Sequence, residues 1–133
     1  MIVINTEKLI TKLRNIVAAG TSLALTDVFS PDLPQDGEDI CCMSLLGGTS
    51  EDKLDNTNMY SIQTLRVLIR GSENDTTTRA LVDEVRASLH LLSQESYTGG
   101  NIISCMTSGL PTYVGKDANQ RILYNMNFRL QVE

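Results

Sequence analysis

The sequence predicts an α+β domain, a two-layer sandwich in which two helices cover one face of a mainly antiparallel, four-stranded sheet. Three observations predict this fold. Residues 121–132 alternate apolar and polar side chains, as a strand with one buried face does. Residues 6–19 and 75–93 instead repeat apolar side chains at helical spacing, with one apolar stripe each. Shorter apolar runs supply the remaining strands and give the chain order α-β-β-α-β-β.

The first helix is expected over residues 6–19, where apolar residues recur at i, i+1, i+4, i+7 and i+8. Asn5 or Thr6 can cap its first turn, and Gly20 suits its end. The second helix is expected over residues 75–93. Its apolar stripe comprises Leu81, Val85, Leu89 and Leu92.

Three strands besides the last are expected at residues 39–46, 60–70 and 101–108. The segments between the elements are expected to be loops. Residues 21–38 carry two prolines and several turn formers, and residues 47–59 are mostly polar after a Gly-Gly pair. Because residues 47–59 have little apolar surface to bury, we expect them to form a mobile loop.

The strand alternation predicts which side chains enter the core, since successive residues of a strand point to opposite faces. In the strand at 60–70, the inner face is expected to comprise Leu65, Val67 and Ile69. The opposite face would carry Thr64, Arg66, Leu68 and Arg70. In the last strand, Phe128 is expected to pack with Val67 and Leu89 between the two layers.

Length and composition fit one domain over residues 1–133. The chain is 41% hydrophobic and 20% charged, which are ordinary values for a globular protein. Its net charge of −5 argues against sequence recognition of nucleic acid, which needs clustered basic residues. The first residues lack the pattern of a signal peptide, and no apolar run is long enough to span a membrane. We therefore expect synthesis in the cytoplasm and no membrane partner.

No catalytic, cofactor or metal site is expected. The three cysteines include the adjacent pair Cys41 and Cys42 and lack the Cys-x-x-Cys spacing of zinc sites. The single histidine, His90, falls among leucines of the second helix and fits a half-buried position. Acidic residues gather at 36–39 and 51–55, without the spacing of a calcium-binding loop.

Two stretches carry a recognisable pattern. Residues 61–71 read SIQTLRVLIRG, a strand that ends in Arg-Gly. Residues 110–133 read LPTYVGKDANQRILYNMNFRLQVE, a proline-containing loop, a Gly-Lys-Asp-x-Asn turn and a final strand. Together with the order of elements in the rest of the chain, this pattern resembles the minor capsid and tail-terminator proteins of long-tailed bacteriophages.

The resemblance implies a structural protein of the virion, without catalytic residues or cofactors. In that family, six copies form a ring that stops growth of the tail tube and presents a surface to the head connector. The partners implied are further copies of the chain, the tail-tube protein, and the head connector or a head-completion protein. The implied location is the head–tail junction.

A ring subunit must meet its neighbours through sheet edges, the outer sheet face or loops. The candidate subunit-interface residues are Arg66, Arg70 and Arg129, with Asp117 as an acidic partner. Arginine suits this role because its guanidinium pairs bidentately with carboxylates. The alternative is that these side chains are simply solvated at the surface.

Other classes of function stay open from the sequence. One is a small cytoplasmic ligand-binding or regulatory α+β domain. Another is an enzyme that uses Cys105 or His90, for which the sequence offers no supporting constellation. A neighbouring head-completion protein would share most of the features described above.

Overall fold

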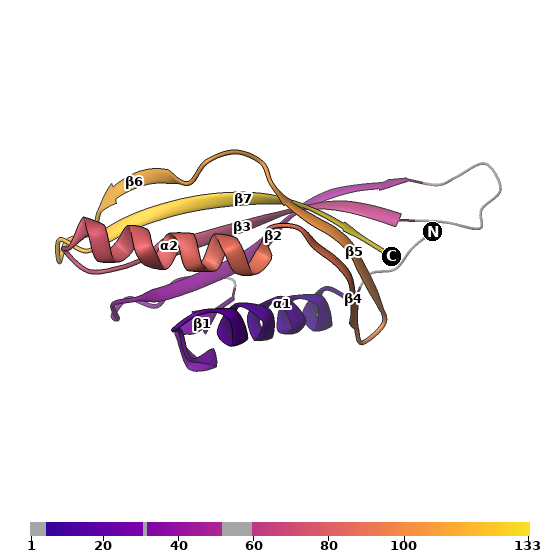
Figure 1. Cartoon of the computed structure of the whole chain (residues 1–133), viewed down its shortest axis with the longest axis horizontal. Coiled ribbons are helices and arrows are strands. Elements are labelled where there is room, and N and C mark those ends of the chain that lie inside the picture. Colours follow the sequence, from indigo (N-terminus) through magenta and orange to yellow (C-terminus); the bar gives the residue numbers. More distant parts are fainter. Residues whose placement is uncertain (1–4, 31, 52–59) are drawn as a thin grey trace.

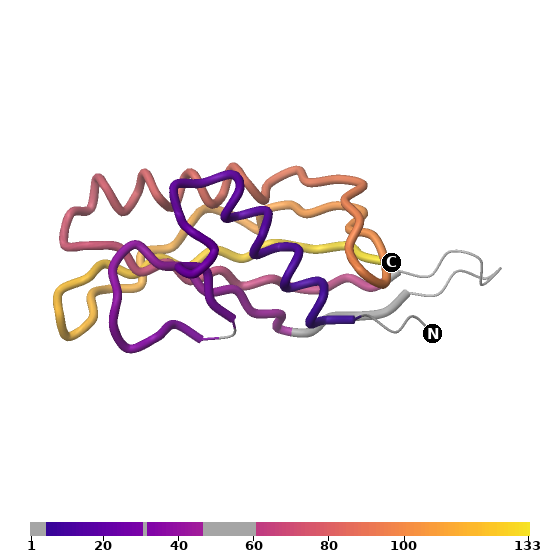
Figure 2. Tube along the Cα trace, turned by 90° about the horizontal axis from the view of Figure 1, so that it is seen from below, coloured from indigo at the N-terminus to yellow at the C-terminus, as the bar shows by residue number. Residues whose placement is uncertain are grey.

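The computed structural model describes residues 5–30, 32–51 and 60–133, which form two layers (Figure 1). Helices α1 (Thr6–Gly20) and α2 (Asp75–Leu89) make up one layer. A curled sheet makes up the other, and both helices lie on the same side of it. Figure 2 shows α1 running obliquely across the strands, whereas α2 follows their direction more closely. The predicted α+β class is confirmed.

The sheet has seven strands within the described residues, in the order β1-β2-β3-β7-β5-β4, and β6 also pairs with β7. The strands are β1 (Val28–Phe29), β2 (Ile40–Glu51), β3 (Tyr60–Arg70), β4 (Leu92–Tyr97), β5 (Gly100–Thr107), β6 (Thr112–Lys116) and β7 (Ile122–Val132). β1 pairs with β2 in parallel, and every other pairing is antiparallel. The prediction of a four-stranded sheet in the order α-β-β-α-β-β is therefore wrong in strand number and order.

The second helix ends at Leu89 rather than at residue 93 as predicted. The chain turns at Leu91, whose φ of 66° lies in the left-handed region, and enters β4. Leu92 then packs on the core from β4, opposite Cys105 of β5. An apolar residue fits this position in either element, so its spacing could not reveal the boundary.

The sequence predicts loops where β1 and β6 lie, and these predictions are also wrong. β1 is too short to show alternation, and the residues of β6 are largely exposed, so neither carries an apolar pattern. β2 continues to Glu51, into the segment 47–59 that the sequence predicts as a loop. Residues 52–59 lie outside the described residues.

The length of β7 follows from its central place in the sheet. On one edge it pairs with β3 over ten residues, from Leu123 to Val132. On the other edge it pairs first with β6, beside Ile122–Asn125, and then with β5, beside Phe128–Val132. One strand therefore has to be long enough to serve three partners.

The predicted core register is confirmed. Phe128, Val67 and Leu89 are fully buried and belong to one cluster between the sheet and the helices. Leu65 and Ile69 are likewise fully buried on the inner face of β3. The polar positions of β3 and β7 consequently lie on the opposite face of the sheet.

Candidate interaction surface

The face of the sheet opposite the helices is called the open face here. Its side chains occupy positions that alternate with core residues on β2, β3, β5 and β7. It comprises Ser44, Thr64, Arg66, Leu68, Met106, Asn125, Asn127 and Arg129. Met106, Asn127 and Arg129 are exposed, and the others are half-buried. The charged members of this set are both arginines, so the open face is positive in a chain of net charge −5.

Three polar atoms of the open face are shielded from solvent and make no hydrogen bond within the described part of the chain. They are Ser44 Oγ, Arg66 Nε and Asn125 Oδ1. Ser44 and Arg66 are direct cross-strand partners, and Asn125 lies on β7 two residues from Asn127, the partner of Arg66 on that strand. Shielded polar atoms in proteins are normally hydrogen-bonded. The open face therefore covers three polar atoms that have no hydrogen-bond partner among the described residues.

One end of the open face is covered by the chain itself. Arg70 ends β3 and Arg121 precedes β7, and they are 6% and 7% exposed. Arg121 donates hydrogen bonds from Nη1 to the carbonyl of Gly37 and from Nη2 to that of Gln35, each at 3.1 Å. Arg70 Nε donates to the carbonyl of Gly37 at 2.9 Å. These bonds fix the segment 35–37 to the end of the sheet.

Asp117 completes this cluster. Its Oδ2 accepts a hydrogen bond from Arg121 Nε at 2.7 Å and lies 3.9 Å from Arg70 Nε. Its Oδ1 accepts from the backbone N–H groups of Asn119 and Arg121, at 2.9 Å each. Burial acts to raise the pKa of Asp117, but the hydrogen bonds from Arg121 and Asn119 outweigh it and lower that pKa below its ordinary value of 3.8. Burial, followed by the charge of Arg121, lowers the pKa of Arg70.

The four candidate interface residues therefore fall into two groups. Arg70 and Asp117 lie close together inside one subunit, so the charge pairing expected across subunits is present within the chain. Arg66 and Arg129 lie apart from this cluster, on the open face. A contact of any of the four with a second subunit stays a prediction.

Sequence reasoning missed Arg121, which makes more hydrogen bonds in this cluster than Arg70 does. A signal was present in the Gly-Lys-Asp-x-Asn turn. An aspartate in such a turn accepts hydrogen bonds from backbone N–H groups that follow it. Arg121 stands four residues after Asp117, and the same turn brings its side chain back to that carboxylate.

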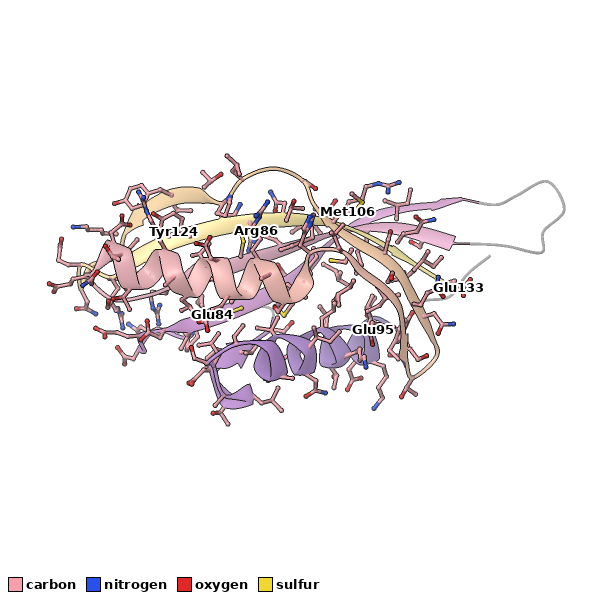
Figure 3. All side chains as sticks on the ribbon, viewed as in Figure 1. Glu84, Arg86, Glu95, Met106, Tyr124 and Glu133 are labelled. Carbon is pink, nitrogen blue, oxygen red and sulfur yellow. The ribbon has the colours of Figure 1, made fainter. Side chains whose placement is uncertain are left out.

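Exposed apolar side chains gather from the end of β5 to β6. This apolar strip begins beyond Met106 and comprises Leu110, Tyr113 and Val114, which are 81%, 53% and 56% exposed. The ring of Tyr113 packs edge-on against Tyr124 of β7, with centroids 5.7 Å apart. Figure 3 shows Tyr124 on the α2 side of β6, where its hydroxyl donates to Asp75 Oδ1 at 2.9 Å and accepts from Arg79 Nε at 3.1 Å. The strip is thus an uncovered surface on a fixed support, as interaction sites often are.

The cysteines and the histidine lie in structural positions. Burial raises the pKa of Cys105 to about 12, and burial together with the neighbouring Cys42 raises that of Cys41 to about 12. Both thiols therefore stay protonated at neutral pH, which makes them poor nucleophiles. His90 Nδ1 accepts a hydrogen bond from the backbone N–H of Thr107 at 3.3 Å.

The described residues also bear on metal binding and on membrane insertion. No group of three or more His, Cys, Asp or Glu side chains among them could hold a metal ion. None of the helices they form has the length and apolar character needed to cross a membrane.

Comparison with known proteins places the chain in a family. No curated protein matches it. A solved structure described as "Virion of native gene transfer agent (GTA) particle" contains a chain with a TM-score of 0.62 and 17% sequence identity, over 93% of this chain and 91% of that chain. At that identity, the likeness shows a shared fold. A family model described as bacteriophage tail terminator protein matches residues 12–133, which include both recognisable stretches of the sequence. The chain therefore belongs to the bacteriophage tail terminator family.

Proposed function

We propose that six copies of this phage structural protein form a ring that caps the tail tube, ends tail elongation and provides the joining surface to the head. The observation that carries the proposal is the family match, which runs from residue 12 to residue 133 and so spans the whole sheet. The protein acts at the head–tail junction of the virion, after synthesis in the host cytoplasm.

A ring in this position needs contacts with neighbouring copies, with the tail-tube protein, and with the head connector or a head-completion protein. The subunit has separate surfaces that suit several partners. The open face is polar and positive, whereas the apolar strip lies at the edge of the sheet. Arg66 and Arg129 are the interface candidates that project from the open face. Arg70 and Asp117 contribute indirectly, because they help to hold the segment 35–37 in place.

The test is polymerisation of the cognate tail-tube protein with and without this chain, with tube lengths measured by electron microscopy. We expect the chain to stop elongation and to appear as a ring at one tube end. Arg129→Glu reverses an exposed charge on the open face, and Lys8→Glu is its matched control on the exposed side of α1. The Arg129 variant should cap tubes at least tenfold less well, while the control caps normally.

Other outcomes identify the competing functions. Tubes of unrestricted length, together with tight binding to the head connector, would indicate a head-completion protein. A monomer that binds neither the tail-tube protein nor the head connector would contradict the proposal and favour a regulatory or ligand-binding domain.

A further inference from the structure

Two strand edges on opposite sides of the sheet lack a partner within the described residues. β6 pairs with β7 on one side and with no strand on the other. β2 is covered on its outer side by β1 only at Cys41 and Cys42, so its outer edge is free from Met43 onward. Free edges expose backbone N–H and C=O groups that readily pair with another chain.

The third edge, β4, differs from these two because it is protected. Gln94 has a φ of 56° and is missing from the ladder with β5, which interrupts the pairing at that position. Its neighbours Ser93 and Ser96 are exposed and polar. Glu95 pairs with Lys12 of α1 at 3.6 Å, and Figure 3 shows it facing that helix. Interruption and polar side chains are the usual protection of an edge against pairing.

The directions of the free edges suit an antiparallel contact between copies. β2 and β7 run in the same direction, since each is antiparallel to β3. β6 is antiparallel to β7 and therefore runs opposite to β2. Copies related by rotation about an axis within about 45° of the strand direction keep neighbouring strands close to antiparallel. The β6 edge of one copy then meets the β2 edge of the next head to tail, the type of contact that closes rings.

The register of the strands determines the stagger of such a contact. Successive cross-strand pairs place Thr112 of β6 in the same row as Asn125 of β7, Leu68 of β3 and Cys42 of β2. In that row the outer edge of β2 is already paired with β1. A neighbour must therefore shift by about four residues, or about 13 Å, to reach the free part of β2. Each copy contributes the four strands β2, β3, β7 and β6, which are together about 19 Å wide. If the strands tilt by about 35–45° to the ring axis, neighbouring copies are offset along the strands by about 13–19 Å. The required stagger lies within this range.

The side chains beside the two edges are also complementary. β6 offers Tyr113 and Val114 of the apolar strip. Beside the free edge of β2, Leu46 is 56% exposed. A hollow of about 560 Å³ adjoins this edge between β2 and α1, and its lining includes Glu7, Ile10, Ser44 and Leu45. Lys116 of β6 and Glu7 of α1 carry opposite charges, so the docking places a cation near an anion.

From these observations we propose that β6, with the apolar strip, docks in antiparallel fashion on the free edge of β2 and the adjoining hollow of a second copy of this chain. This inference rests on the proposed ring and names its subunit interface. Each contact extends the sheet of one copy into the next, and each copy uses both of its free edges.

Disulfide cross-linking tests the pairing, because a disulfide needs Cβ atoms about 3.5–4.5 Å apart. The four-residue shift places Thr112 opposite Leu46, so a double variant, Thr112→Cys with Leu46→Cys, should give a ladder of covalent multimers on mild oxidation. An equimolar mixture of the two single variants should stop at dimers. The native cysteines are all buried, so they supply little background. Ser96→Cys with Leu46→Cys is the matched control, because it places the first thiol on β4 and should give no ladder.

Light scattering on the same samples separates the two proposals. Rings without a ladder from the Thr112 pair would overturn the edge pairing and leave the ring intact, as would a ladder from the Ser96 control. Monomers under all conditions, with tail-tube protein present, would overturn both. Independently, Val114→Glu should abolish rings with an unchanged melting temperature, whereas Ser93→Glu on β4 should leave rings intact. Normal rings with Val114→Glu would also overturn the pairing.

Discussion

Arg121→Met tests whether the cluster at the end of the sheet holds the segment 35–37 in place. Methionine keeps a long, unbranched side chain but removes the charge and every hydrogen-bond donor. The substitution breaks the bonds to the carbonyls of Gln35 and Gly37 and the bond to the carboxylate of Asp117. Because the side chain of Arg121 is only 7% exposed, water cannot easily enter the space that the guanidinium group leaves.

The magnitude follows from the two carbonyl contacts. A hydrogen bond from a charged donor contributes about 1.5–3 kcal/mol. Gln35 is exposed, so its carbonyl can regain water, and the carbonyl of Gly37 keeps its bond from Arg70. We therefore expect Arg121→Met to lower the free energy of unfolding by about 2–4 kcal/mol. For a domain of this size that corresponds to a fall in melting temperature of about 6–20 °C.

The assay is thermal unfolding followed by circular dichroism from pH 7 down to pH 3. The lowered pKa of Asp117 means that its ionised form stabilises the fold above the ordinary value of 3.8, and that this stabilisation is lost as the pH falls through 3.8 towards the lower folded value. The variant should show a smaller loss over that range, because Arg121 supplies part of the shift. Lys116→Met removes an exposed charge from the same turn and should change stability by less than about 0.5 kcal/mol. Equal stability of the two variants, or the same pH profile in Arg121→Met as in the unsubstituted chain, would refute the reasoning.

Three further predictions concern the subunit itself. Phe128→Ala should lower the free energy of unfolding by about 3–5 kcal/mol in urea titrations, since the ring is fully buried, and the exposed Asn127→Ala should cost less than about 0.5 kcal/mol; similar midpoints would contradict the register of β7. Arg70→Glu should lower the melting temperature strongly, because it puts an acidic group where a buried cation now donates to the carbonyl of Gly37. A variant that is stable but does not assemble would show instead that Arg70 contributes to the contact between subunits. Cys41 and Cys105 should react with iodoacetamide only as fast as the chain unfolds, as followed by mass spectrometry at pH 7, and fast alkylation of the folded chain would contradict their burial.

The parts of the fold that could be predicted are those where burial imposes a period on the sequence. β7 buries every second side chain from Ile122 to Val132, so its alternation predicted the strand and its register. The start of α1 was likewise predictable, since Asn5, one of its two expected caps, accepts a hydrogen bond from the backbone N–H of Lys8. β6 pairs with β7 through its backbone while its side chains stay largely exposed, so these side chains carry no such period and the sequence predicts a loop.

The candidate site could be predicted only in part, and for a related reason. Alternation placed Arg66 and Arg129 on the face away from the helices, and that placement is correct. The same alternation placed Arg70 there too, but it could not show that the segment 35–37 folds back over this residue. Contacts between segments more than thirty residues apart leave no local pattern, so the pairing of Arg121 with that segment had to come from the structure.

The central position of β7 has a consequence for the order in which the sheet can fold. β7 follows all three of its partner strands in the chain, so β3, β5 and β6 are synthesised before the strand that joins them. The β2–β3 pair and the β4–β5 pair are close in sequence and can form early, but the two pairs are joined only when β7 is present. Sheets that depend on such distant pairings fold slowly. Until β7 is in place, the nascent chain exposes edges that the finished subunit covers, and these edges can pair wrongly with other chains. Because β3 is synthesised well before β5 and β6, its edge waits longest for β7 and is the one most open to wrong pairing.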